Sequence, residues 1–300
     1  MPDFSIALRH RCASAILPLV APAILLAACA APGASMAQAL PQGATQADTG
    51  AAAPTYADLV DMARASQVVM RVVVADQAEV RAERAPGLAA GQARLYLETE
   101  TQALLKAPGA MGESQVFLVD RPLTERGKAP KLKKQSFLIF ANLVPGRPGE
   151  LALAGAQAMQ PADPALELRL REVLTQLAQT PAEPLPTGIR DIISVPGNLA
   201  GESETQMFVE TAGGTPVSLS VIRRPGMAPV WGVSWSEIVD QSASAPQPGT
   251  VEWYRLACFL PAELPRAAFL QDDSASRSRA TEDYRFVQQS LGPCERRLTG

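Results

Sequence analysis

Histidine is almost absent from this 300-residue chain, and its single copy, His10, falls in a segment with the pattern of a secretory signal. Removal of that segment leaves no imidazole for a Ser-His-Asp or Cys-His mechanism, or for a zinc or iron site built on histidine. This absence argues against many hydrolases, metallopeptidases and oxygenases. We therefore predict no metal site.

Cysteine is nearly as scarce. The four copies are Cys12, Cys29, Cys258 and Cys294, and cleavage after Ala39 leaves only the last two. Because an exported protein enters an oxidising compartment, we predict a Cys258–Cys294 disulfide, whose closed loop stabilises the fold by roughly 3 to 4 kcal/mol. A free or redox-active thiol pair is the alternative, although no Cys-x-x-Cys spacing supports it.

The sequence also lacks the common cofactor signatures. It has no Gly-rich phosphate loop, no EF-hand pattern and no Rossmann fingerprint, so we expect no cofactor. Removing residues 1–39 takes away Arg9, Arg11 and Asp3, which leaves 25 basic and 29 acidic residues and a net charge of −4. This mild acidity gives no general attraction to nucleic acid. No later apolar run is long enough to span a bilayer, so we expect no transmembrane span in the mature chain.

The N-terminal segment carries the signals for export. Arg9-His10-Arg11 precedes an apolar run from Ala13 to Ala31 and the small residues Ala37-Gln38-Ala39, which predicts a secretory signal over residues 1–39 and a bacterial periplasmic location. The stretch Leu26-Ala27-Ala28-Cys29 resembles the lipobox of bacterial lipoproteins. Lipidation of Cys29 would make the protein membrane-tethered rather than soluble, and both alternatives stay open. Residues 40–54 read as a disordered tether.

The remaining chain predicts an α+β fold, with two small β-rich units of mainly antiparallel strands and a few peripheral helices. The first unit, residues 55–179, begins with a helix that is capped by Thr55 in a capping box and runs to about Ser66. A second helix, with Asp163 as its N-cap, closes the unit. Between them we predict five strands, at residues 68–75, 94–105, 115–120, 136–143 and 151–154.

A proline-rich linker over residues 180–188 separates this unit from a second one, residues 189–300. Alternating runs such as Val217–Val221 and Trp231–Trp235, joined by Gly- and Pro-containing turns, predict an antiparallel meander. We expect Val251–Leu260 to be a further strand of this unit. The polar residues 271–280 are expected to be mobile, and a terminal helix should run from Thr281 to Gly292-Pro293.

One candidate site is the loop Val195–Gln206, which contains Asn198, Glu202 and Glu204. Two carboxylates at a suitable separation can act as acid and base in glycoside cleavage, so Glu202 and Glu204 are weak candidates for catalysis. Asn198 is a candidate binding residue. The alternative is a turn whose polar residues lead into a strand.

A second candidate site is a basic loop between two predicted strands. It contains Arg121, Arg126, Lys128, Lys131, Lys133 and Lys134. Such a cluster can bind anionic lipid headgroups, polyanionic envelope polymers or an acidic partner protein. The loop lacks the aromatic rings on which single-stranded nucleic acid stacks. An ordinary solvated loop is the alternative.

Aromatic residues are concentrated in the second unit. Trp231, Trp235, Trp253 and Tyr254 could line a groove for a sugar or a peptide. We expect Trp231 in the core. Because Trp253 and Tyr254 are neighbours on an expected strand, one of them should face outward as a binding residue.

From these observations we hypothesise that the chain is an exported, non-enzymatic protein of the bacterial envelope. It would bind an envelope protein, glycan or anionic lipid surface through the loops of the second unit or through the basic loop. The alternative is a histidine-independent, carboxylate-based enzyme that acts on envelope polysaccharide through Glu202 and Glu204. A lipid-associated module is a third reading, for which the basic loop is the discriminating feature.

Overall fold

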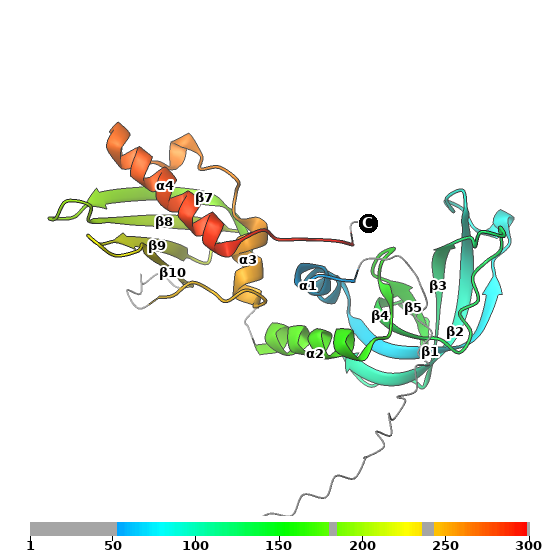
Figure 1. The fold of residues 1–300 in the computed structure, drawn as a ribbon. Coiled ribbons are helices and arrows are strands. Elements are labelled where there is room, and N and C mark those ends of the chain that lie inside the picture. The colour runs from blue at the N-terminus through cyan, green and yellow to red at the C-terminus, as the bar shows by residue number, and fades with distance from the viewer. Residues whose placement is uncertain (1–52, 180–184, 236–242, 299–300) are drawn as a thin grey trace, which may run out of the picture. The chain divides into compact units, whose positions relative to one another are not determined.

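A computed structural model describes residues 53–179, 185–235 and 243–298 of the chain (Figure 1). Within these residues there are four α-helices and two mostly antiparallel sheets of six and four strands, which confirms the α+β class. The expected secretory signal, Cys29 and nearly all of the expected tether lie outside the described residues. So do residues 180–184 of the expected linker.

The larger sheet forms a barrel. Its strands are β1 (Val68–Glu79), β2 (Gln92–Lys106), β3 (Ser114–Pro122), β4 (Ser136–Leu143), β5 (Glu150–Leu153) and β6 (Met159–Pro161). The order is β1-β2-β3-β5-β4-β6, and pairing of β1 with β4 closes the ring. Only the short β3–β5 pair is parallel among these pairings. Strands β1 to β5 thus close into a five-stranded barrel, and β6 adds to it through β4.

Alternation along the strands fills the barrel interior. In β2, Leu95 and Leu97 are buried while Tyr96 and Glu98 are exposed, as expected when successive side chains point to opposite faces. Phe117 of β3 joins the same apolar cluster. All five strands predicted for this unit are confirmed, with ends shifted by a few residues.

Two helices flank the barrel strands in the sequence, one before β1 and one after β6. Helix α1 (Tyr56–Ala65) begins at Thr55, whose hydroxyl accepts the backbone N–H of Asp58 while the Asp58 carboxylate accepts that of Thr55. This confirms the predicted capping box. Helix α2 (Pro164–Gln179) begins after Asp163, whose carboxylate accepts the N–H of Leu166. The predicted N-cap is therefore also confirmed.

The smaller sheet is a four-stranded meander. Its strands are β7 (Pro186–Pro196), β8 (Ser203–Thr211), β9 (Val217–Arg223) and β10 (Val230–Ser234), in the order β10-β9-β8-β7. All pairs are antiparallel, as predicted. Helix α4 (Ser274–Leu291) lies across one face of this sheet (Figure 1). Trp231 of β10 is buried on that face and donates its indole N–H to Ser290 of α4 at 2.8 Å, so its core position is confirmed.

Helix α3 (Val251–Phe259) corrects the strand expected at Val251–Leu260. The β-branched and aromatic residues of this segment suggested a strand. Its helical start is defined by Thr250, whose hydroxyl accepts the N–H of Trp253 at 3.2 Å. Burial of both Trp253 and Tyr254 against neighbouring elements then favours the helix, because adjacent residues of a strand would point to opposite faces.

Helix α4 (Ser274–Leu291) starts earlier than expected. Its N-cap is Asp273, which accepts the N–H of Ser276 at 2.8 Å, so most of the segment 271–280 is helical and the expectation of a mobile stretch is wrong there. The expected end is confirmed: Gly292 caps the helix with a positive φ of 70°, which glycine adopts without strain. Among the described residues, no helix is both long and apolar enough to cross a membrane.

Candidate binding surfaces

The basic loop between β3 and β4 is held against the barrel by specific contacts. Leu132 is buried in the barrel core. The side-chain oxygen of Gln77, on β1, accepts the backbone N–H groups of Leu132 and Lys133 at 2.5 and 3.2 Å, and the Gln77 amide donates to the carbonyl of Pro130 at 2.9 Å. The loop is thus fixed as a defined surface that is built onto the end of β1.

Five cationic side chains project from this loop into solvent. We call them the cationic loop, and they are Arg126, Lys128, Lys131, Lys133 and Lys134. Lys134 has a φ of 69° and is the only non-glycine residue with a positive φ among the described residues. Its N–H donates to the carbonyl of Val74 at 2.8 Å. The backbone therefore accepts a strained conformation to close the loop onto β1.

Arg121 does not belong to this surface, which corrects its placement in the predicted cluster. Its guanidinium donates to the carbonyl of Met159 at 2.8 Å, and burial lowers its pKa. One carboxylate partly neutralises the loop, because Asp76 of β1 lies 3.1 Å from the Lys133 ammonium. This contact holds the pKa of Asp76 below its usual value.

Glu202 has a clear role in the β7–β8 hairpin. One of its carboxylate oxygens accepts the backbone N–H groups of Asn198 and Leu199 at 3.0 and 3.2 Å. The side chain folds over Gly197, where an added Cβ would lie 2.3 Å from the Glu202 Cγ. The carboxylate thus closes the turn, which agrees with the alternative that this loop is a turn whose polar residues lead into a strand. Asn198 itself is exposed.

Glu204 lies on β8, where its carboxylate accepts from the Gln206 side chain at 2.8 Å. Glu202 and Glu204 therefore bind different partners, and none of these contacts joins the two carboxyl groups. The catalytic pair stays a prediction.

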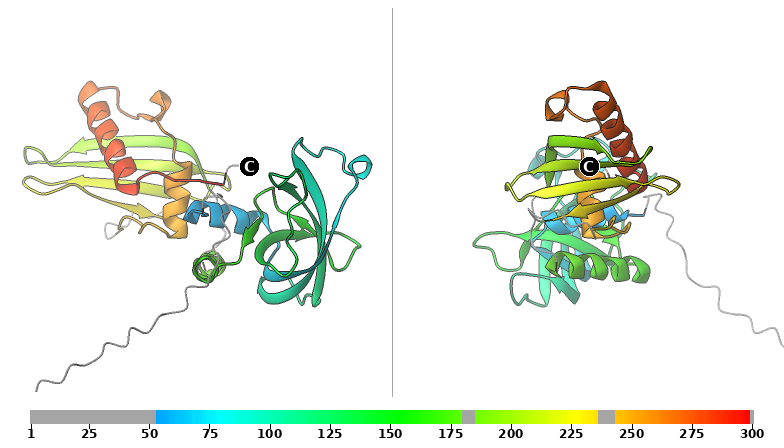
Figure 2. Two further views of the ribbon diagram at one scale, coloured as in Figure 1. Left: turned by 45° about the vertical axis from the view of Figure 1, so that its right-hand side comes forward. Right: turned by 90° about the vertical axis from the view of Figure 1, so that its left-hand side faces the viewer.

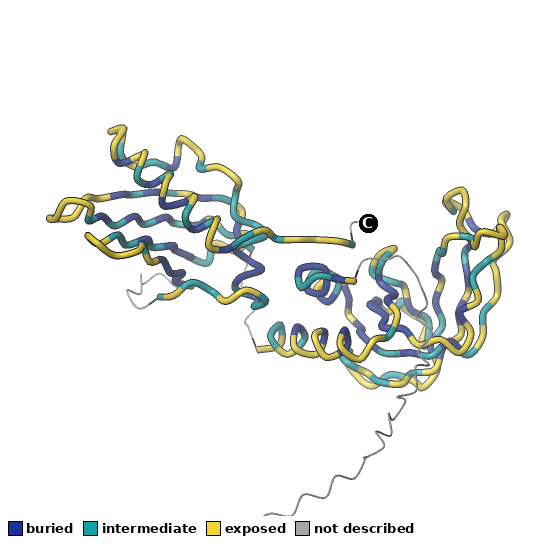
Figure 3. Tube along the Cα trace, in the orientation of Figure 1, coloured by how far each residue is buried: buried dark blue, intermediate teal, exposed yellow. Residues whose placement is uncertain are grey.

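The same hairpin reveals an exposed apolar surface that the sequence analysis missed. We call it the hairpin end: it comprises Val195, Leu199, Met227 and Val230, all exposed at the β7–β8 and β9–β10 hairpins. In Figure 3 the ends of these hairpins are exposed, whereas the strands behind them alternate between buried and more accessible residues. A single large apolar residue within each turn, in Gly197-Asn198-Leu199 and Gly226-Met227, was the available signal.

Trp253 and Tyr254 do not form an open groove. Both are buried, at 9% and 1% exposure, so the prediction that one faces outward is wrong. The Trp253 indole donates to the carbonyl of Leu291 at 2.7 Å. The Tyr254 hydroxyl donates to Asp61, and burial together with this carboxylate raises its pKa. These contacts explain both aromatics as structural.

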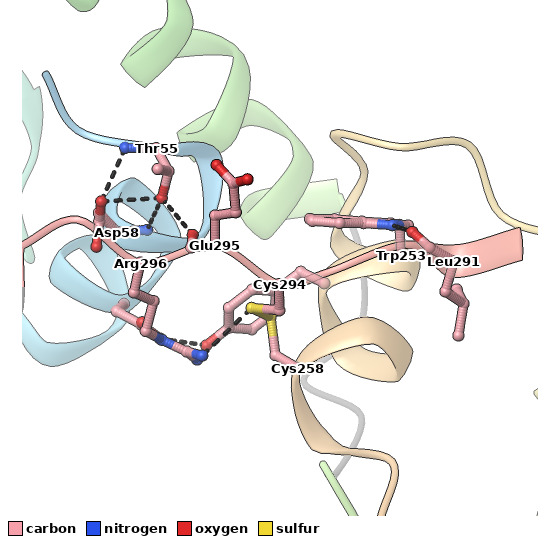
Figure 4. Close-up of a disulfide and its surroundings, with 10 residues drawn as sticks. Thr55, Asp58, Trp253, Cys258, Leu291, Cys294, Glu295 and Arg296 are labelled. Atoms are coloured by element: carbon pink, nitrogen blue, oxygen red, sulfur yellow. Dashed lines mark hydrogen bonds and ion pairs between the residues drawn. A yellow bond between two sulfur atoms is a disulfide. The ribbon is translucent and has the colours of Figure 1, made fainter. Parts of the chain in front are cut away.

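The predicted disulfide between Cys258 and Cys294 is present (Figure 4). It joins α3 to the segment that follows α4. That segment continues along α1, where the Thr55 hydroxyl donates to the carbonyl of Glu295 at 2.7 Å. Arg296 forms an ion pair with Asp61 at 2.6 Å. The disulfide therefore lies between the end of α4 and the residues of the C-terminal segment that contact α1.

Asp58 joins the capping box to this C-terminal segment. Besides Thr55, its carboxylate accepts the N–H groups of Arg297 and Leu298 at 3.0 and 3.2 Å. Burial acts to raise its pKa, but the hydrogen bonds from Thr55, Arg297 and Leu298 outweigh burial and lower it below 3.8. The carboxylate is thus held ionised by backbone donors.

A buried polar network connects α4 to the second sheet. Asp283 is fully buried and accepts from Arg223 of β9 and Thr205 of β8, each at 2.5 Å. Thr205 also contacts the Ser194 hydroxyl at 2.8 Å. All four groups have partners, as buried polar groups usually do, so we assign the network a structural role.

Within the described ranges, no three His, Cys, Asp or Glu side chains are grouped so that they could hold a metal ion. Neither the protein-family models nor the curated proteins contain a match to this chain.

Proposed function

We propose that this chain is an exported, non-enzymatic binding protein that attaches to a polyanionic surface of the bacterial envelope through the cationic loop. The observation that carries the proposal is the arrangement of five exposed cations on a loop that Leu132 and Gln77 fix to the barrel. Because the backbone is already ordered, binding costs less conformational entropy than it would for a flexible basic segment.

The ligand chemistry follows from the side chains. Ammonium and guanidinium groups pair with phosphate and carboxylate oxygens, which are present both in anionic lipid headgroups and in acidic envelope polymers. Near an anionic lipid surface each Lys or Arg contributes about 1 kcal/mol of binding free energy. Neutralising three of the five cations should therefore weaken binding by about 3 kcal/mol, or roughly a hundredfold.

The test is co-flotation of the full-length protein with vesicles of phosphatidylcholine containing one quarter phosphatidylglycerol. Cys29→Ser is included so that acylation cannot contribute. We compare K131Q/K133Q/K134Q with R81Q/R84Q/R277Q, a control that removes three exposed cations elsewhere and changes the net charge equally. Selective loss of binding in the first variant supports the proposal, and equal behaviour of the two variants contradicts it.

A second arm separates the two sources of anions. A soluble polymer of the acidic type, such as a polyglutamate, is added as competitor to the vesicle assay. Displacement at low polymer concentration assigns the loop to carboxylate polymers, whereas retention on the vesicles assigns it to lipid phosphate. Binding that is unchanged by raising NaCl from 0.1 to 0.5 M would contradict an electrostatic attachment altogether.

A further inference from the structure

We propose that the hairpin end of the second sheet inserts into the headgroup region of a lipid bilayer, with Leu199 and Met227 as the leading side chains. Leu199 and Met227 are 63% and 62% exposed, and Val195 and Val230 behind them are 43% and 54% exposed. These four belong to two hairpins, yet they are found at one end of one sheet. Single exposed apolar residues are ordinary, but such a group indicates an interaction site.

Strand register places the four residues at one end of the sheet, with Val195 and Val230 on its two outer strands. Val195 pairs with Glu204, Glu204 with Ile222, and Ile222 with Val230, so this row crosses all four strands on one face. Leu199 and Met227 lie in the turns just beyond the row. Figure 2 shows the two hairpins ending side by side at the same end of the sheet.

The β7–β8 turn has backbone that suits a medium of low polarity. A backbone N–H without a partner is costly in lipid. Glu202 accepts the N–H groups of Asn198 and Leu199, and the N–H of Gly197 donates to the carbonyl of Glu202 at 2.8 Å. The N–H groups of Gly197, Asn198 and Leu199 are therefore satisfied within the turn, next to the exposed Leu199 side chain.

The β9–β10 turn adds an exposed cation next to Met227. The N–H of Met227 donates to the carbonyl of Arg224 at 3.2 Å, and Arg224 is exposed. The Arg224 guanidinium, three residues before Met227, can reach lipid phosphate while the apolar tip enters the acyl boundary. Glu204, the one carboxylate of the row, limits insertion to the tips, because its charge must stay hydrated.

The size of the surface favours a bilayer over a protein partner. Four half-exposed aliphatic side chains present roughly 400 Å² of apolar surface, about half of the 800 Å² that each partner buries in a standard protein interface. A bilayer has no such minimum, since each inserted side chain contributes by itself. We therefore assign the hairpin end to lipid rather than to a second copy of the chain.

This inference does not depend on the cationic loop, and the two surfaces differ in salt dependence. The test uses the full-length Cys29→Ser protein and vesicles of phosphatidylcholine alone, with 0.5 M NaCl to screen charges. L199S/M227S is compared with L168S/L270S, in which the replaced leucines are 60% and 61% exposed on other elements. We expect the hairpin variant to lose at least about tenfold in vesicle partitioning and the control to bind as the parent does.

Several outcomes would overturn the inference. These are absence of partitioning by the parent protein, equal partitioning of both variants, or a dimer in light scattering that only L199S/M227S dissociates. The last outcome would assign the surface to self-association. Thermal unfolding of each variant controls for loss of fold. If K131Q/K133Q/K134Q loses binding only to anionic vesicles, this inference is unaffected. The two proposals can therefore fail independently of each other.

Discussion

Replacing Cys258 and Cys294 by serine should lower the free energy of unfolding by about 4 kcal/mol. The bonded cysteines are 36 residues apart in sequence. In the chain-entropy model, closing a loop of that length removes about 13 cal/mol/K of entropy from the unfolded chain, which is about 4 kcal/mol at 25 °C. That amount is a large part of the stability of an ordinary domain.

Urea unfolding followed by tryptophan fluorescence measures this loss, because all three tryptophans, Trp231, Trp235 and Trp253, belong to the same half of the sequence as the disulfide. The parent protein in a strong reductant should match the double serine variant. Asp58→Ala serves as a comparison, since it keeps the disulfide but removes the carboxylate that accepts the N–H groups of Arg297 and Leu298.

Two results would refute this reasoning. A loss below about 1 kcal/mol in the double serine variant would show that the chain-entropy account does not apply to this loop. A loss in Asp58→Ala that equals the loss in the double serine variant would show that docking of the C-terminal segment, rather than the covalent link, supplies the stability.

Four further outcomes are expected. Because hydrogen bonds lower the folded-state pKa of Asp58 below 3.8, its stabilisation is complete above that pH and is lost as pH falls through the folded pKa; acid titration of unfolding should therefore be shallower in Asp58→Asn. Lys134→Gly relieves a positive φ and should raise the unfolding free energy by up to about 1 kcal/mol in urea titrations, whereas Lys134→Glu should not. Asp76→Asn releases Lys133 from its ion pair and should strengthen flotation with anionic vesicles while leaving the free energy of unfolding nearly unchanged, because the pair is exposed. Glu204→Lys adds a cation to the row behind the hairpin end and should increase the salt-sensitive part of vesicle binding; weaker binding of this variant would contradict its proposed depth.

Local signals predicted much of the fold. The Thr55 capping box, the Asp163 N-cap and the alternation around Leu95 and Leu97 each involve residues close in sequence, and each is confirmed. Closure of the barrel was beyond this reasoning. It depends on the β1–β4 and β3–β5 pairings, whose partners are far apart in the chain and leave no mark in local periodicity.

Helix α3 shows how packing overrides local preference. The segment from Val251 to Phe259 is rich in residues that favour strands, and the sequence prediction followed that preference. The cap at Thr250 was a visible signal for a helix. Burial of both Trp253 and Tyr254 then decided the outcome, and this depends on neighbours that the sequence does not place.

The candidate surfaces were predictable to different degrees. The cationic loop could be found from composition because its charges lie close together in the sequence, although composition could not tell that Arg121 turns inward to Met159. The hairpin end could not be found in that way. Leu199 and Met227 are nearly thirty positions apart in the sequence, and only the register of β8 with β9 brings their turns together.

The charge pattern of the barrel favours the cationic loop over the sheet itself as the site for the proposed polyanion. Here Asp76, Glu98, Val116 and Glu150 form one row across β1, β2, β3 and β5, so three carboxylates face outward around an apolar residue. A polyanion over this face would meet like charges, which costs binding free energy. The proposed polyanion would therefore favour the β3–β4 loop, where Lys133 forms an ion pair with Asp76 at the edge of that row. Replacing the carboxylates of this row by cationic side chains should therefore extend polyanion binding from the loop onto the barrel sheet.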